Sequence, residues 1–126
     1  VYNDRSMVRA GHCKADDIAI HVLATVVSRP TPCRAVLDCG SKALTSDLIG
    51  FDDYGIIDTF EDARIVSLYE EHAVVACDPS FPDVGAVLRV VPNHACVISN
   101  LFERVVFHRQ GVVTRVESVT ARGAVW

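Results

Sequence analysis

The chain has 126 residues, enough for one domain with a modest core, and half of them are hydrophobic. A formal net charge of −4 with scattered basic residues argues against a nucleic-acid-binding surface, and no apolar run approaches the roughly 20 residues that a membrane-spanning helix needs. The chain carries five cysteines, an odd number, and its polar N-terminus lacks the features of an export signal, which predicts reduced thiols in the cytoplasm.

The predicted elements in the first third of the chain are mostly short strands. Residues 1–11 are polar, and we expect them to form a leading segment or linker. Apolar residues alternate along 16–29 and several are β-branched, which predicts a strand. A second, shorter strand over 35–37 runs into residues 38–41, whose composition is typical of a turn.

The middle third contains two apolar runs, 64–69 and 73–77, which flank the charged turn Glu70-Glu71-His72. We expect both runs to be strands. Residues 87–91 predict a further strand, and Pro92 ends it because proline has no N–H for the sheet.

The last third of the chain predicts a hairpin. Residues 97–102 favour one helical turn. The β-rich runs 104–109 and 112–116 flank Gln110-Gly111, and a two-residue loop that contains glycine is typical of a hairpin. Residues 118–126 predict a last extended segment. Many short strands without alternating helices predict an all-β fold, mainly an antiparallel barrel or sandwich, with at most short helical turns.

A His-x-Cys motif follows the proline that ends strand 87–91. His94 and Cys96 lie two residues apart, so in an extended backbone both side chains point to the same side and Ala95 points away. Imidazole nitrogen and thiolate sulfur are ligands that Zn²⁺ prefers, which makes His94 and Cys96 candidate metal ligands. The competing interpretation is a packed thiol beside a hydrogen-bonded histidine.

The charged turn provides candidate catalytic residues. Glu70, Glu71 and His72 could supply a base, or an acidic group that holds a metal-bound imidazole or water. The alternative is a solvated turn between two strands. Lys42 could be mistaken for a cofactor-binding lysine, but no glycine-rich phosphate-binding loop accompanies it. We expect Lys42 to lie in a short strand and to be structural or to face a neighbouring domain.

Several segments together resemble one family. The stretch from Val91 to Cys96 resembles the signature of the C-terminal D-serine dehydratase-like domain, which occurs in D-serine dehydratases and metal-activated D-threonine aldolases. The other matching segments are Val1-Tyr2-Asn3-Asp4, residues 36–44, Glu70-Glu71-His72, Ser99-Asn100-Leu101-Phe102, Arg104-Val105-Val106, Gln110-Gly111 and Ala121-Arg122-Gly123. The resemblance covers essentially the whole chain, and it implies a single β-domain over residues 1–126.

These enzymes resemble alanine racemase in plan. An N-terminal α/β barrel holds pyridoxal phosphate on a lysine, and a C-terminal β-domain completes the active site. The resemblance implies that the cofactor-binding barrel is absent from this chain, is its partner in the enzyme, and is needed for activity. It also implies a homodimer that acts on a small D-amino acid.

The resemblance further implies that His94 and Cys96 bind a divalent metal beside the cofactor. Aldolase-type members carry Asp where this chain has Cys96, and a thiolate favours Zn²⁺ over Mn²⁺ or Mg²⁺. This favours D-serine dehydratase-like β-elimination of a D-3-hydroxyamino acid over retro-aldol cleavage. Two other interpretations stay open: a free-standing β-barrel that binds metal or ligand without catalysis, and a structural interaction domain in which both side chains merely pack.

Overall fold

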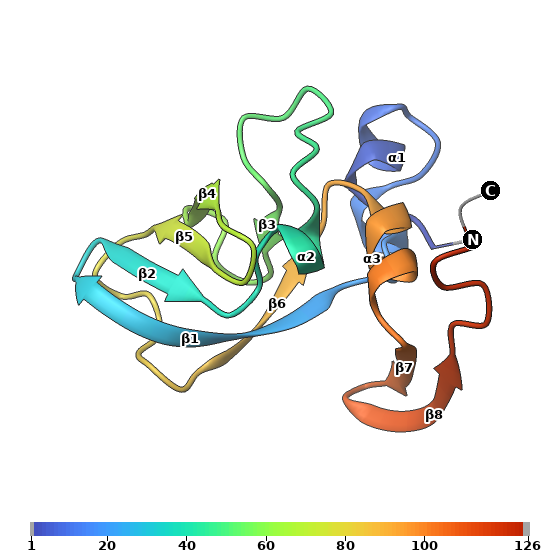
Figure 1. Ribbon diagram of the computed structural model, residues 1–126. Helices are drawn as coiled ribbons and strands as arrows, with labels where there is room; N and C mark the ends of the chain where they lie inside the picture. Colours follow the sequence, from blue (N-terminus) through green and yellow to red (C-terminus); the bar gives the residue numbers. More distant parts are fainter. Residues whose placement is uncertain (1, 125–126) are drawn as a thin grey trace.

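The computed structural model describes residues 2–124, and its main body is a closed barrel of six antiparallel strands (Figure 1). The strands are β1 (Val22–Thr31), β2 (Arg34–Leu37), β3 (Ile56–Ile57), β4 (Arg64–Leu68), β5 (Ala73–Ala76) and β6 (Val87–Val91). They follow one another around the barrel in the order β1-β2-β5-β4-β3-β6. The predicted all-β, antiparallel fold is confirmed, and it is a barrel rather than a sandwich.

The barrel interior is filled by alternate residues of its strands, because successive side chains of a strand point to opposite faces. On β1, Val22, Ala24 and Val26 are buried, whereas Leu23 between them is exposed. The other strands contribute buried residues in the same way: Ala35, Leu37, Ile57, Ile65, Ala73, Val75, Leu88 and Val90. Each fully buried branched side chain contributes about 1.5–3 kcal/mol to stability.

The remaining elements lie at one side of the barrel (Figure 1). They are α1 (Arg5–Arg9), the 3₁₀ turn η1 (Ala15–Asp17), α2 (Ser41–Leu44), α3 (Ala95–Leu101), and the strands β7 (Arg104–Arg109) and β8 (Val112–Ser118). Helix α2 packs against α3. Strands β7 and β8 form a two-stranded sheet of their own, which confirms the predicted hairpin. No helix among residues 2–124 is long and apolar enough to cross a membrane.

Two predictions for the first part of the chain are wrong. The polar segment 1–11 contains α1, and Asp4 begins this helix by accepting a hydrogen bond from the backbone N–H of Met7. The first strand starts at Val22 rather than near residue 16, because residues 15–17 form η1. There the side chain of Asp17 accepts a hydrogen bond from the backbone N–H of Lys14, at 2.9 Å.

Two later predictions also need correction. Lys42 lies in α2 and not in a strand. The segment after β8 turns through residues 120–123 instead of remaining extended. The backbone N–H of Gly123 donates to the side-chain oxygen of Asn100, at 2.8 Å, which ties this turn to α3. Residues 125 and 126 of the predicted segment lie outside the described residues.

Candidate functional site

The His-x-Cys motif lies where the chain passes from β6 into α3. Pro92 and Asn93 are fully buried after the end of the strand, and His94 is the residue before the first turn of the helix. His94 has extended backbone angles (φ −140°, ψ 124°), but the helix starts at Ala95, so the prediction of extended backbone through Cys96 is wrong. Ala95 is nevertheless buried, while Cys96 is exposed and His94 is partly exposed.

The imidazole of His94 lies beside the carboxylate of Asp4. Its Nδ1 atom is 3.4 Å from Oδ2 of Asp4. This Nδ1 atom is also buried, and it makes no hydrogen bond of good geometry with any residue in the part of the chain that the structure describes. Burying a polar nitrogen without a hydrogen-bond partner costs free energy. The Asp4 carboxylate, which is a hydrogen-bond acceptor, lies next to this nitrogen.

The Asp4 carboxylate is itself held by three donors. Its Oδ1 accepts hydrogen bonds from the Ser6 hydroxyl (2.6 Å) and the Met7 backbone N–H (3.1 Å), and Oδ2 accepts one from the Ala95 backbone N–H (2.7 Å). Burial by itself would raise the pKa of Asp4, but these hydrogen bonds and the nearby His94 outweigh burial and lower the pKa below its ordinary value. Asp4 is therefore an ionised side chain at the start of both α1 and α3.

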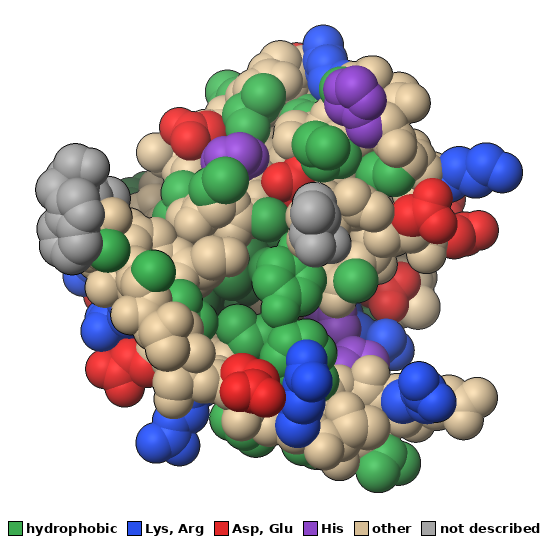
Figure 2. All heavy atoms as spheres, turned by 90° about the vertical axis from the view of Figure 1, so that its right-hand side faces the viewer, with side chains coloured by type: hydrophobic (Ala, Val, Ile, Leu, Met, Phe, Trp, Pro, Cys, Tyr) green, Lys and Arg blue, Asp and Glu red, His purple; other side chains and the backbone are tan. Residues whose placement is uncertain are grey.

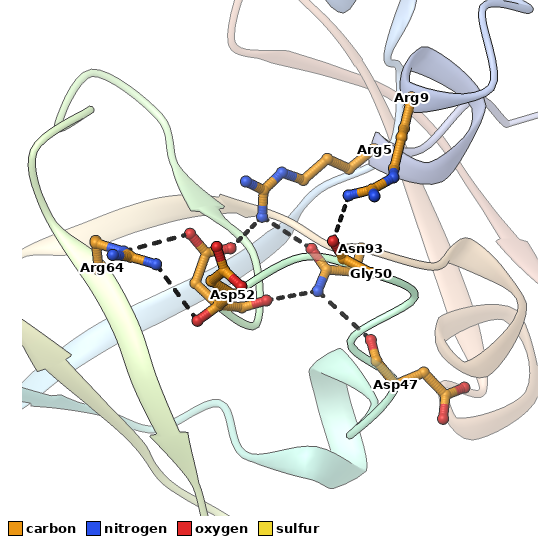
Figure 3. A network of polar contacts seen from close by, with 8 residues as sticks. Arg5, Arg9, Asp47, Gly50, Asp52, Arg64 and Asn93 are labelled. Carbon is orange, nitrogen blue, oxygen red and sulfur yellow. Dashed lines mark hydrogen bonds and ion pairs between the residues drawn. The ribbon is translucent and has the colours of Figure 1, made fainter.

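Asn93 fixes the motif from the other side (Figure 3). Its amide nitrogen donates to the backbone oxygen of Asp53 at 2.7 Å and to that of Asp47 at 3.4 Å. Its amide oxygen accepts a hydrogen bond from the guanidinium of Arg5, at 3.0 Å, and the same guanidinium pairs with the carboxylate of Asp53. The residue before His94 is thus joined to α1 and to the loop before β3.

Backbone hydrogen bonds dock α1 on the same segment. The N–H groups of Arg5 and Ser6 donate to the carbonyl oxygens of Pro92 (3.3 Å) and Asn93 (3.1 Å). Sequence reasoning did not find the roles of Asp4, Arg5 and Asn93. An aspartate followed by a helix-forming run is a recognised signal for a helix start, but nothing local indicates that this carboxylate also meets His94, 90 residues later in the sequence.

The structure brings Glu70 and Glu71 to Lys42. The Lys42 ammonium lies 2.7 Å from a carboxylate oxygen of Glu71 and 3.1 Å from one of Glu70, and all three side chains are largely exposed. The hydrogen bonds that the ammonium donates to Glu71 and Glu70 raise the pKa of Lys42, and the hydrogen bond that Glu71 accepts from Lys42 lowers the pKa of Glu71. The carboxylate that lies beside His94 is that of Asp4. The role predicted for Glu70, Glu71 or His72, to supply a base or to hold a metal-bound imidazole or water, stays a prediction.

The cysteines differ sharply in accessibility. Cys39 is buried in the barrel core, and burial raises the pKa of its thiol to about 12, so it stays protonated at neutral pH. Cys96 and Cys33 are exposed. Among residues 2–124 no three side chains of His, Cys, Asp or Glu are grouped closely enough to hold a metal ion by themselves.

Comparison with known proteins gives a match to one family model. The model describes a putative serine dehydratase domain, and it matches residues 19–108. An uncharacterized protein of Mycobacterium tuberculosis is 42% identical over 128 residues, which cover 95% of this chain and 96% of the mycobacterial protein. The D-threonine aldolase of an Arthrobacter species is 38% identical over 110 residues, which cover 83% of this chain but only 27% of the aldolase.

Solved structures of similar fold include two of D-threo-3-hydroxyaspartate dehydratase. A histidine-to-alanine mutant has a TM-score of 0.85 and 25% identity, and the match covers 97% of this chain and 36% of the dehydratase chain. A cysteine-to-alanine mutant in the metal-free form has a TM-score of 0.79 and 27% identity, with 93% and 36% covered. This chain therefore spans about a third of the dehydratase chain and nearly the whole of the mycobacterial protein.

Proposed function

This chain belongs to the putative serine dehydratase domain family, and from that membership we propose that it is the metal-bearing C-terminal part of a pyridoxal-phosphate-dependent lyase. The substrate class is a D-3-hydroxyamino acid, because the similar enzymes are named for D-threonine, D-serine and 3-hydroxy-D-aspartate. We favour β-elimination, as in a D-serine dehydratase, with retro-aldol cleavage as the alternative reaction.

The observation that carries the proposal is the His-x-Cys motif at the start of α3, in which a partly exposed imidazole, His94, and an exposed thiol, Cys96, are two residues apart. The side chains fit a zinc ion chemically, since imidazole nitrogen and thiolate sulfur are its preferred ligands. The local geometry fits as well: Nδ1 of His94 faces the Asp4 carboxylate, which leaves Nε2 for a metal. The mutated histidine and cysteine of the two dehydratase structures are also numbered two apart, and the cysteine mutant is a metal-free form.

The rest of this chain would hold the pair in place. Pro92 ends β6, Asn93 anchors the loop to α1 and to the loop before β3, and Ala95 points into the core. A catalytic zinc usually has three protein ligands and one open position, so this pair is half of a site. When bound, the ion would act as a Lewis acid on the β-hydroxyl oxygen of the substrate.

Pyridoxal phosphate would come from a separate N-terminal barrel, where it supplies carbanion stabilisation at the substrate α-carbon. The chain spans only about a quarter of the D-threonine aldolase it matches, which leaves room for such a barrel in that enzyme. We propose that the barrel is the partner of this chain and that Glu70, Glu71 and His72 face the shared site.

A second candidate is a free-standing domain that binds metal without catalysis. It is favoured by one observation: the mycobacterial relative is matched over 96% of its length, so a protein of this size exists without a cofactor-binding barrel in the same chain. Both candidate functions require His94 and Cys96 as metal ligands. They differ in whether a lyase reaction depends on the bound metal.

Zinc titration of the 126-residue chain by calorimetry tests whether His94 and Cys96 bind the metal. We expect one zinc per chain and a loss of affinity of more than about 100-fold in His94→Ala and Cys96→Ser, because each variant removes a ligand. Cys33→Ser is the matched control, since it removes another exposed thiol, and it should bind zinc as the wild type does. Cys96→Asp should shift the preference toward Mn²⁺. Unchanged affinity in Cys96→Ser would refute Cys96 as a ligand.

A chimera separates the two candidates. This chain would replace the matching part of the Arthrobacter D-threonine aldolase, and turnover would be assayed with pyridoxal phosphate and zinc. The lyase proposal predicts turnover that His94→Ala abolishes, with pyruvate from D-serine for elimination or glycine from D-threonine for aldol cleavage. The chain alone should turn over neither substrate. A folded chimera that binds zinc but has no activity would favour the free-standing domain.

A further inference from the structure

We propose that Asp4 is a positioning residue of the metal site. Its carboxylate accepts the Nδ1–H of His94, which fixes one tautomer of the imidazole and directs Nε2 to the metal. This inference rests on the proposed function, because it assigns a role toward the metal that His94 and Cys96 would bind. It makes the first helix of the chain part of the metal site.

The first support is that a buried carboxylate lies beside a buried ring nitrogen of the otherwise partly exposed His94. Asp4 is 4% exposed, and its Oδ2 lies 3.4 Å from Nδ1 of His94. Within residues 2–124, this Nδ1 is the one buried side-chain nitrogen or oxygen that lacks a hydrogen-bond partner. The Asp4 carboxylate is a strong acceptor beside it, and a small rotation of the ring would complete the hydrogen bond.

The second support is the rigidity of the carboxylate. Three donors hold it: the Ser6 hydroxyl and the Met7 N–H on Oδ1, and the Ala95 N–H on Oδ2. Oδ2 therefore has one short hydrogen bond and a lone pair left for Nδ1. An acceptor fixed in this way from both helices can set the orientation of a ring, whereas a mobile surface carboxylate could not.

The third support is the tautomer that this contact requires. A neutral imidazole carries its proton on one nitrogen and a lone pair on the other. If Nδ1 lacked the proton, its lone pair would face the ionised Asp4 carboxylate, which is unfavourable. With the proton on Nδ1, the lone pair is on Nε2, and Nε2 can bind a metal.

If Asp4 only stabilised the fold, its substitution would have different consequences. Asp4 begins α1 and also binds the first N–H of α3, so any substitution costs stability. Ser6→Ala is a matched control, because it removes a donor from the same carboxylate without touching His94. A structural role predicts that Asp4→Asn and Ser6→Ala differ only in stability.

The first experiment needs no variant. Nitrogen-15 NMR of the metal-free chain at a pH where His94 is neutral should show the proton of His94 on Nδ1. A proton on Nε2 in the wild type would overturn the inference whether or not any Asp4 variant folds.

The second experiment is titration of the chain with Co²⁺, followed by the near-ultraviolet charge-transfer band that a Cys96 thiolate would give. Asp4→Asn should weaken Co²⁺ binding by about 10- to 100-fold and mix the His94 tautomers, whereas Ser6→Ala, which leaves two of the three donors on the carboxylate, should change both much less. Wild-type affinity and tautomer in a folded Asp4→Asn would overturn the inference while leaving the metal site intact. If His94→Ala bound Co²⁺ as the wild type does, the proposed metal site itself would fail.

Discussion

Asn93 shows how much of the site depends on single side chains with distant partners. The sequence motif identified His94 and Cys96, because their chemistry and spacing can be read locally. The partners of the neighbouring Asn93 lie 40, 46 and 88 residues away, and no periodicity or composition connects them. Asp4 could not be predicted as a site residue for the same reason, since its contact with Ala95 spans 91 residues.

Substitution Asn93→Ala should destabilise the chain by about 1–3 kcal/mol, because it leaves the Asp53 carbonyl without its donor and removes one of the two acceptors of the Arg5 guanidinium. Asn100→Ala is the control: Asn100 is exposed and accepts one hydrogen bond from Gly123, so its loss should cost about 0.5 kcal/mol or less. Urea unfolding of both variants measures the difference. Equal losses would contradict the anchoring role of Asn93.

At the scale of elements, the strands could be predicted because burial in the barrel imposes a period of two on the sequence. The apolar runs before and after Glu70-Glu71-His72 correspond closely to β4 and β5, and residues 87–91 match β6. The short helices are harder to predict from the sequence than the strands. Helix α2 has four residues, too few for a 3.6-residue period to show, and its position depends on a close backbone approach at Gly40.

Gly40 lets α2 pack against the β4–β5 turn. A Cβ atom there would lie 2.2 Å from the backbone oxygen of Tyr69, which accepts a hydrogen bond from the Ser41 N–H at 2.8 Å. We expect Gly40→Ala to cost about 3 kcal/mol or more, since backbone atoms must move.

Gly111 provides the comparison for this prediction. It has φ +81° but open space around it, so Gly111→Ala should cost about 1–2 kcal/mol from backbone strain alone. Thermal unfolding of the two variants tests the order. A smaller loss for Gly40→Ala than for Gly111→Ala would contradict the close approach seen at α2.

At the scale of the whole molecule, the β7–β8 hairpin lies outside the barrel and keeps apolar side chains on its surface. Val106, Val112, Val113 and Val116 are each more than half exposed. Figure 2 shows the side of the molecule that faces right in Figure 1, where hydrophobic side chains gather in the middle of the face. Composition alone, with half of the residues hydrophobic, does not indicate where on the molecule apolar surface lies. The predicted homodimer stays a prediction.

We expect the isolated chain to self-associate through this hairpin. The double variant Val106→Thr/Val116→Thr keeps β-branched residues at one cross-strand pair and should weaken association by about tenfold. Leu23→Thr, at an exposed position of the barrel, should leave association unchanged. Sedimentation velocity over a range of concentrations measures the effect. A wild-type chain that stays monomeric throughout would contradict this prediction.

Anomalous diffraction from crystals of the chain grown with zinc would show directly whether His94 and Cys96 hold one divalent metal. We expect one zinc peak, about 2.0–2.1 Å from Nε2 of His94 and about 2.3 Å from the sulfur of Cys96, with Nδ1 still facing Asp4. Zinc bound only elsewhere, for example at the His21–His108 pair whose ring centres lie 5.1 Å apart, would contradict it. So would zinc bound to Nδ1 of His94.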